Sequence, residues 1–384
     1  MRKVQHANII EFMAAVERGH ERYLFFRWAE GGNLRSFWEA HERPTLTRSF
    51  VKDIVDQIYG LADALDVLHS GRYGGDSYRH GDLKPENILC VTCKASGPGQ
   101  VHVPILKIAD MGLAKHHRVA TSLRPATSMR YTTTRYEPPE VVFKLNLGRS
   151  RRYDMWSLGC VILEKIIWLL FGRDSLQEFN SKIVDEDGGS SHWFEKNTGD
   201  TPGHRAKVHF HVRDTIRALE TDQECSSNTA MRDLLDIVKT KLLVVEIGDA
   251  TLAIGGDMSN PKSKAGSRVY SQELMYCLRE LVQKGANNES YWYTGNSRDR
   301  LPKLVVTSDG RHAKQPSLLS PEAALLPEQR IGIPIHVRDT DDVETDHEAQ
   351  ISLAVPAPMA SRRELKTRRV RRPSDEPCAV LTFT

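Results

Sequence analysis

The sequence lacks the features of a membrane or secreted protein. Its most apolar stretch, VILEKIIWLLF at 161–171, is interrupted by Glu164 and Lys165 and is too short to cross a bilayer. The N-terminus shows no apolar signal segment. We therefore expect a protein of a reducing compartment, cytosolic or nuclear, without membrane contact. The six cysteines have no disulfide-like spacing: Cys90, Cys93, Cys160, Cys225, Cys277 and Cys378.

A strong excess of one charge is also absent. The net charge is +3, which is too small to indicate a nucleic-acid partner. Cys90 and Cys93 form one C-x-x-C, but a second pair of zinc ligands at suitable spacing is not evident, so we interpret both as packed thiols. With 40% apolar and 27% charged residues, the composition is that of an ordinary globular protein.

Hydrophobic periodicity predicts a mainly helical protein with a few short strands. Residues 51–69 carry apolar side chains at spacings of three and four, which is typical of an amphipathic helix. YLFFRWA at 23–29 is a β-rich run followed by a turn at Gly31-Gly32-Asn33. A buried strand is predicted at 105–110, and further helices at 153–171, 230–245 and 268–284.

The character of the sequence changes after about residue 300. Half of the chain's eighteen prolines lie in 301–384, together with an acidic run and the basic run RRELKTRRVRR at 362–372. Neither a helical nor a strand period persists there, so we expect a disordered tail. We interpret the basic run as a solvated charge cluster; a localisation or docking segment is the alternative.

Two short motifs predict phosphoryl transfer. This reaction needs a carboxylate for the proton of the attacking hydroxyl, a cation near the migrating phosphoryl group and hard oxygen ligands for Mg²⁺. HGDLKPEN contains Asp82, Lys84 and Asn87, and ADMGLA at 109–114 adds Asp110 before the turn residue Gly112.

These motifs resemble those of the eukaryotic protein kinases. HGDLKPENILC resembles their catalytic loop, ADMGLA their magnesium-binding D-F-G motif and RYEPPE at 135–140 their A-P-E motif. RYDMWSLGCVILE at 152–164 is similar to the buried helix that follows, HANII at 6–10 to the entry of the fourth strand, and SRVYSQEL at 267–274 to a late lobe helix. The motifs occur in the family's order, which makes a chance match improbable.

The resemblance implies a role for each matching residue. Asp82 is expected to be the catalytic base and Lys84 the phosphate-neutralising lysine typical of Ser/Thr-specific members. Asp154 would anchor the catalytic loop, and Arg268 would pair with Glu140. The other implied assignments are Asn87 and Asp110 as magnesium ligands, Phe26, Arg27, Trp28, Ala29, Ile88 and Leu89 around the adenine of ATP, Thr133 in the activation segment, and His80 as a structural residue.

The implied fold class is α+β. We expect a protein-kinase-like fold, mostly the helical C-lobe with a remnant of the N-lobe sheet (the end of helix C and strands 4 and 5). Residues 1–33 would be that remnant and the hinge, and 34–300 the C-lobe, with the catalytic loop at 78–90 and the activation segment at 110–140. The family's Gly-rich loop and V-A-x-K lysine are not found before HANII, so we expect a truncated N-lobe without the nucleotide clamp. An exposed apolar face, open to a partner, would then remain on the C-lobe.

Three functions are compatible with these patterns. The first is ATP- and Mg²⁺-dependent phosphorylation of serine or threonine in a protein substrate. The second is a pseudokinase that binds partners without transferring phosphate, which the expected loss of the nucleotide clamp favours. The third is a small-molecule phosphotransferase, because HGDL also occurs in aminoglycoside and choline kinases; Lys84-Pro85-Glu86, the PPE at 138–140 and DMWSLG oppose it. Gly81 replaces the arginine that usually receives an activation-loop phosphate.

Overall fold

The fold, taken from a computed structural model, consists of two compact units. One contains residues 1–6, 10–30 and 313–384, and the other residues 7–9 and 31–312. Within them the structure describes residues 5–19, 21–72, 77–91, 102–110, 115–117, 134–143, 150–184, 191–196, 206–226, 228–245, 267–295, 303–306, 366–370 and 378–383. The predicted end of helix C would precede residue 5 and lies outside the described residues.

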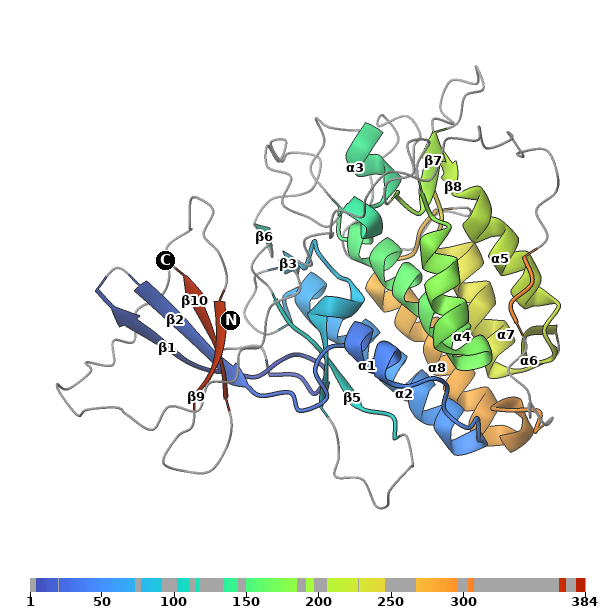
Figure 1. The fold of residues 1–384 in the computed structure, drawn as a ribbon, viewed down its shortest axis with the longest axis horizontal. Helices are drawn as coiled ribbons and strands as arrows, with labels where there is room; N and C mark the ends of the chain where they lie inside the picture. Colours follow the sequence, from blue (N-terminus) through green and yellow to red (C-terminus); the bar gives the residue numbers. More distant parts are fainter. Residues whose placement is uncertain are drawn as a thin grey trace, which may run out of the picture. The chain divides into compact units, whose positions relative to one another are not determined.

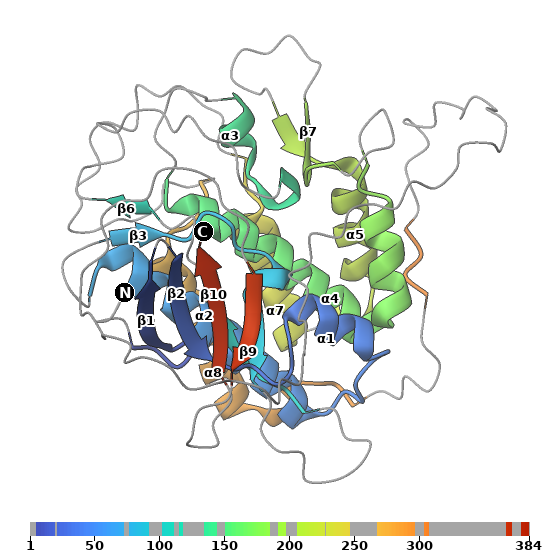
Figure 2. The same ribbon diagram turned by 60° about the vertical axis from the view of Figure 1, so that its left-hand side comes forward.

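The first unit is a four-stranded antiparallel sheet (Figure 2). Its strand order is β1-β2-β10-β9, so the two ends of the chain meet in one sheet. Phe12 and Phe26 are cross-strand partners with ring centroids 5.8 Å apart in an edge-to-face arrangement, which favours this register. The strands are β1 Phe12–Arg18, β2 Glu21–Arg27, β9 Lys366–Val370 and β10 Cys378–Phe383.

Two C-terminal strands lie within the segment 301–384, which we expected to be a disordered tail: β9 and β10. β10 pairs with β2 from Cys378 opposite Arg27 to Phe383 opposite Arg22, and β9 pairs with the other edge of β10. An exposed strand edge offers unpaired N–H and C=O groups, so even a charged segment of low hydrophobicity gains backbone hydrogen bonds there.

The second unit is mainly helical, with three two-stranded ladders (Figure 1). Its longer helices are α2 Arg48–Ser70, α4 Arg152–Ser181, α5 Phe210–Glu220 and α8 Ser271–Asn287. The short helices are α1 Leu34–Ala40, α3 Pro139–Phe143, α6 Gln223–Ser226 and α7 Ala230–Ile237, which continues as one π turn Val238–Leu242. The strands are β3 Ser77–Arg79, β4 Ile88–Val91, β5 Ile105–Ile108, β6 Lys115–His117, β7 Phe194–Lys196 and β8 Ala206–Val208, and the 3₁₀ turns are Pro85–Asn87, Thr134–Tyr136 and Glu289–Tyr291.

The predicted amphipathic helix is confirmed as α2. Thr47 caps its N-terminus by accepting a hydrogen bond from the Phe50 amide at 3.1 Å, and Gly71 ends it in the left-handed conformation with φ 69°. Its apolar stripe is buried, and it packs along α8. The helices predicted at 153–171 and 268–284 are also present, as the first part of α4 and as α8.

Helix α4 is the core helix of this unit. It is long and apolar enough to cross a membrane by length and composition, but its apolar window is 100% buried within the fold. Gly172, with φ 83°, bends the chain inside α4, and residues beyond it form a more polar second part. The burial on all sides explains why this segment shows no one-sided apolar stripe.

One titratable group in α4 is buried without a hydrogen-bond partner among the described residues. Lys165 is 2% exposed, and its Nζ lies 6.0 Å from the ring centroid of Trp38. Burial lowers the pKa of Lys165 from 10.5 to about 8, although the nearby Cys90 opposes this shift. Below pH 8 the folded protein therefore holds an unfavourable buried charge, and this penalty is relieved as the pH rises from 8 to 10.5.

Replacing Lys165 with methionine should stabilise the protein. We expect Lys165→Met to raise the free energy of unfolding at pH 7 by about 3 kcal/mol, because the variant keeps the apolar stem and removes the buried ammonium group. Urea unfolding at pH 7 and at pH 10 measures this, and the gain should shrink at the higher pH. The exposed Lys196→Met is the matched control. A gain that is equal at both pH values would contradict the electrostatic explanation.

Candidate active site

The segment HGDLKPEN connects β3 to β4 and is held in a fixed conformation. Gly81 has a φ of 80°, a backbone conformation that glycine adopts without strain. The Asp82 amide donates to Nδ1 of His80 at 3.3 Å, and Nε2 of the same ring lies 2.8 Å from the Ala109 carbonyl oxygen. His80 therefore joins this loop to the end of β5.

Asp154 anchors the loop from the first turn of α4. Its carboxylate accepts hydrogen bonds from the amides of His80 at 2.9 Å and Gly81 at 2.8 Å, and it lies 2.7 Å from Nε2 of His69. Asp154 is 0% exposed. Burial raises the pKa of such a group, but the hydrogen bond and charge of His69, with His80 and Arg79, lower the pKa of Asp154 overall.

Two predicted site residues, Lys84 and Asn87, lie within hydrogen-bond distance of the predicted catalytic base, Asp82. Nζ of Lys84 lies 3.0 Å from Oδ2 of Asp82. Nδ2 of Asn87 donates to the Asp82 main-chain oxygen at 2.8 Å and to Oδ2 at 3.2 Å. These contacts fix the Asp82 carboxylate in position while its side chain stays 11% exposed. The arrangement provides a proton acceptor and a cation in one place.

Asp110 follows directly on β5, beside the same loop. The Ala109 amide donates to the Asn87 main-chain oxygen at 2.9 Å, so Asp110 comes one residue after this contact. Asp110 has a φ of 55°, the one positive φ among the described non-glycine residues. Aspartate tolerates this conformation better than most residues, and such positions concentrate at functional sites.

The oxygen atoms of Asn87 and Asp110 fit a magnesium ion. Nδ2 of Asn87 is used toward Asp82, so its amide Oδ1 is the atom suited to a metal, and the Asp110 carboxylate is a hard oxygen ligand. Among the described residues, no group of three or more His, Cys, Asp or Glu side chains forms a metal site. Magnesium is compatible with this, because it keeps several waters and binds through one or two protein ligands plus substrate phosphates.

An ion pair ties the segment after the loop to the core. Both Nη atoms of Arg268 bond the Glu140 carboxylate, at 2.6 and 3.2 Å, and Arg268 is 0% exposed. The same guanidinium donates to the main-chain oxygens of Arg152 and Val244. The structure thus brings together the two residues that the resemblance paired.

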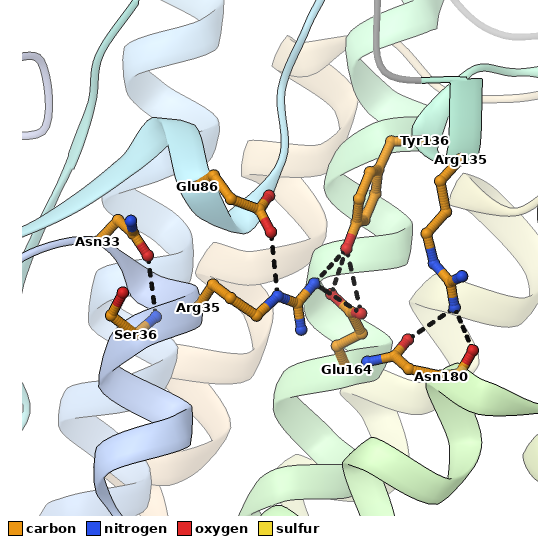
Figure 3. A network of polar contacts seen from close by, with 8 residues as sticks. All are labelled: Asn33, Arg35, Ser36, Glu86, Arg135, Tyr136, Glu164 and Asn180. Atoms are coloured by element: carbon orange, nitrogen blue, oxygen red, sulfur yellow. Dashed lines mark hydrogen bonds and ion pairs between the residues drawn. The ribbon is translucent and has the colours of Figure 1, made fainter. Parts of the chain in front are cut away.

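A second network was missed by the sequence reasoning (Figure 3). Arg35 in α1 donates from Nε to Glu86 at 3.1 Å and from Nη2 to the hydroxyl of Tyr136 at 2.5 Å and to Glu164 at 3.1 Å. Tyr136 also donates to Glu164, which is 0% exposed. Separately, Arg135 donates to both oxygens of Asn180 at 2.9 Å. The KPEN motif contains Glu86, but the sequence gives no signal for its partners.

The comparison with known families agrees with this geometry. The model of the protein kinase domain matches residues 1–229. This chain belongs to the protein kinase family. The predicted α+β fold class is consistent with the kinase fold, because the match includes both the sheet strands β1 and β2 and the helices around the catalytic loop.

Similar curated proteins are also kinases. Myosin light chain kinase 2, skeletal/cardiac muscle, from Bos taurus is 29% identical over 248 residues, which is 62% of this chain and 34% of that protein. The Homo sapiens protein of the same name is 30% identical over 213 residues, 54% and 30% of the two chains. Serine/threonine-protein kinase ICK from Rattus norvegicus is 30% identical over 165 residues, 43% and 22% of the two chains. This kinase thus spans about a third or less of the relatives it matches.

The residues predicted to bind the nucleotide belong to different units of this kinase. Phe26 and Arg27 are in β2, and Trp28 and Ala29 follow that strand in the first unit. Ile88, which is buried, and Leu89 are in β4 of the second unit. Two backbone hydrogen bonds fix the segment after the predicted hinge to β4. The Gly31 amide donates to the Cys90 main-chain oxygen at 2.9 Å, and the Cys90 amide donates to the Gly32 main-chain oxygen at 2.8 Å. The nucleotide site itself stays a prediction.

Two further predictions concern regions that are described in part. Thr133 and most of the activation segment 110–140 lie outside the described residues. The apolar face expected for a partner also stays a prediction, since the exposed large apolar side chains among the described residues are Val184, Tyr276 and Val305.

Substitution of Asp154 should test the anchor of the catalytic loop. We expect Asp154→Asn to lower the free energy of unfolding at pH 7 by about 3–5 kcal/mol, because it removes one partner of a buried charged network. The exposed Asp174→Asn is the control and should change little.

The pH dependence of the same variant gives a second readout. Since the pKa of Asp154 is depressed below 3.8, its stabilisation is complete above that pH and is lost as the pH falls through the folded value. The difference between wild type and Asp154→Asn in urea unfolding should therefore narrow below about pH 4. A difference that stays constant down to pH 2 would show that the carboxylate charge is not responsible.

Proposed function

We propose that this kinase transfers the terminal phosphate of ATP to serine or threonine hydroxyls of a protein substrate. The observation that carries the proposal is the cluster of Asp82, Lys84 and Asn87, held on the buried Asp154 through the amides of His80 and Gly81. The family match and the serine/threonine kinases among its relatives support the same reaction class.

The described residues divide the chemistry among themselves. An Oδ atom of Asp82 accepts the proton of the attacking hydroxyl as its oxygen forms the new bond to the terminal phosphorus of ATP, while the bond from that phosphorus to the bridging oxygen breaks and ADP leaves with the electron pair. The ammonium group of Lys84, 3.0 Å from Asp82, offsets negative charge on the migrating phosphoryl group. Asn87 keeps Asp82 oriented. Asn87 and Asp110 would hold Mg²⁺, which when bound neutralises the phosphate oxygens.

Serine or threonine as the acceptor rests on Lys84. The resemblance links a lysine at this position to Ser/Thr-specific members, and the structure places this lysine beside the carboxylate rather than away from it. A protein as the substrate is supported by the match to the protein kinase domain model, in contrast to a small-molecule phosphotransferase.

Asp82→Asn tests the proposal directly. The purified chain, incubated with Mg-ATP and a mixture of protein substrates, should incorporate phosphate on serine or threonine, and the variant should lose at least about 100-fold of this rate because the proton acceptor is gone. Asp56→Asn on the exposed side of α2 is the matched control and should retain the wild-type rate.

The alternative outcomes have clear meanings. Transfer that survives Asp82→Asn would remove Asp82 from the mechanism. Binding of partner proteins without any transfer, by wild type and variant alike, would favour the pseudokinase function.

A further inference from the structure

A row of buried polar side chains leads from helix α8 to the anchor of the catalytic loop. Its members are Ser271, the first residue of α8, Asp66 and His69 in α2, and Asp154 in α4. Each of the four is at most 4% exposed. Because α2 packs along α8, His69 and Ser271 meet although 202 positions separate them in the sequence (Figure 1).

The contacts along this row are continuous. The Ser271 hydroxyl donates to Oδ1 of Asp66 at 3.0 Å, and the same oxygen lies 3.3 Å from Nδ1 of His69. On the other side of the ring, Nε2 of His69 lies 2.7 Å from Oδ2 of Asp154. One ring nitrogen of His69 therefore meets a carboxylate directly, and the other meets a hydroxyl that is itself bonded to a carboxylate.

The number of available protons sets the charge of this ring. A serine hydroxyl has one proton, and Ser271 gives it to Asp66, because an ionised carboxylate can only accept. Toward His69 the Ser271 oxygen is then an acceptor, so Nδ1 of His69 is the donor. Asp154 also accepts, from two backbone amides, so Nε2 of His69 donates to it as well. Both ring nitrogens carry a proton, and the ring is cationic.

The other charged groups around His69 leave this assignment in place. Arg72 bonds Oδ2 of Asp66, the oxygen that Ser271 does not use. Arg151 donates to the main-chain oxygen of His69 and not to its ring. The titratable and charged groups that face the ring or its two carboxylates from α2, α4 and the loop are Asp66, Asp154, Arg72, Arg151, Arg79 and His80.

We propose that Ser271 and Asp66 are positioning residues for phosphate transfer, which act by keeping both protons on His69. The inference rests on the proposed function, because that function gives the catalytic loop its role. With both protons, His69 is the cation in direct contact with the buried Asp154 carboxylate. Removing the charged partner of a buried carboxylate is strongly destabilising, so the Asp154 anchor depends on this proton count.

From Asp154 the hydrogen bonds continue into the catalytic loop. Asp154 accepts from the amides of His80 and Gly81, and the next residue is the proposed proton acceptor, Asp82. A weakened anchor therefore allows the Asp82 carboxylate to leave its position. Since a small misplacement of a catalytic group costs a large part of the rate, a change at α8 should reach the reaction.

NMR of the full chain labelled with ¹⁵N-histidine measures the proton count without requiring turnover. A neutral imidazole has one ring nitrogen without a proton, and the ¹⁵N signal of that nitrogen is well separated from that of a protonated one. We expect both His69 nitrogens of the wild type to be protonated at pH 7. The His69→Gln variant assigns the signals.

Two variants change the proton count by different routes. Ser271→Ala removes the acceptor of Nδ1. Asp66→Asn keeps every atom that contacts the ring, but its amide group can donate to Ser271 and so frees the hydroxyl proton for Nδ1. In both variants we expect one His69 nitrogen to be unprotonated at pH 7. Ser271→Thr retains the hydroxyl and should restore the doubly protonated ring.

The kinetic readout follows from the same variants. Ser271→Ala and Asp66→Asn should lower kcat about tenfold with little change in KM, because the loop and not substrate binding is affected. Ser181→Ala, an exposed serine at the end of α4, is the matched control and should behave as the wild type. Thermal unfolding of each variant identifies any loss of fold, and the measurement on the wild type depends on no variant.

The outcomes separate this inference from the proposed function. A wild-type His69 with one unprotonated nitrogen overturns it, and so does a ring that keeps both protons in Ser271→Ala and Asp66→Asn. A changed proton count with an unchanged kcat also overturns the positioning role. If the wild type transfers no phosphate, the proposed function fails. The amide signals of His80 and Gly81 then decide the inference, and they should shift in both variants but not in Ser181→Ala.

Discussion

The buried carboxylate of Asp154 is the interaction on which the site depends. An ionised group with no exposure is tolerated because two backbone amides and His69 surround it. Those amides belong to His80 and Gly81, so the hydrogen bonds that stabilise the Asp154 carboxylate also fix the backbone that leads to Asp82. The stability of α4 and the geometry of the catalytic loop consequently both depend on the Asp154 carboxylate.

The sequence predicted the parts of the fold that depend on local pattern and on motif. The apolar period of 51–69 defines α2 because each side chain on its stripe meets the core at a helical spacing. The residues of HGDLKPEN could be placed together because they are close along the chain. Pairing of Arg268 with Glu140 could be predicted from the resemblance alone, since no local pattern relates residues 128 positions apart.

Other features depend on long-range contacts that no sequence pattern predicts. Arg35 meets Glu86 and Glu164 across 51 and 129 residues, and the sequence around each of these side chains does not indicate its partner. The strand β9 lies inside the basic run, which composition classifies as solvated. β9 adopts a strand conformation because it pairs with the free edge of β10. That edge exists only in the folded sheet, so the sequence of residues 366–370 does not reveal it.

The same sheet has a consequence for how the protein forms. The partner of β2 on one side is the hairpin neighbour β1, and on the other side it is β10, which follows more than three hundred residues later. Synthesis proceeds from the N-terminus, so β2 must wait through the production of the whole helical unit before its second edge is paired. Contacts of such large sequence separation form slowly. A strand that is made late therefore completes the pairing of one that is made more than three hundred residues earlier.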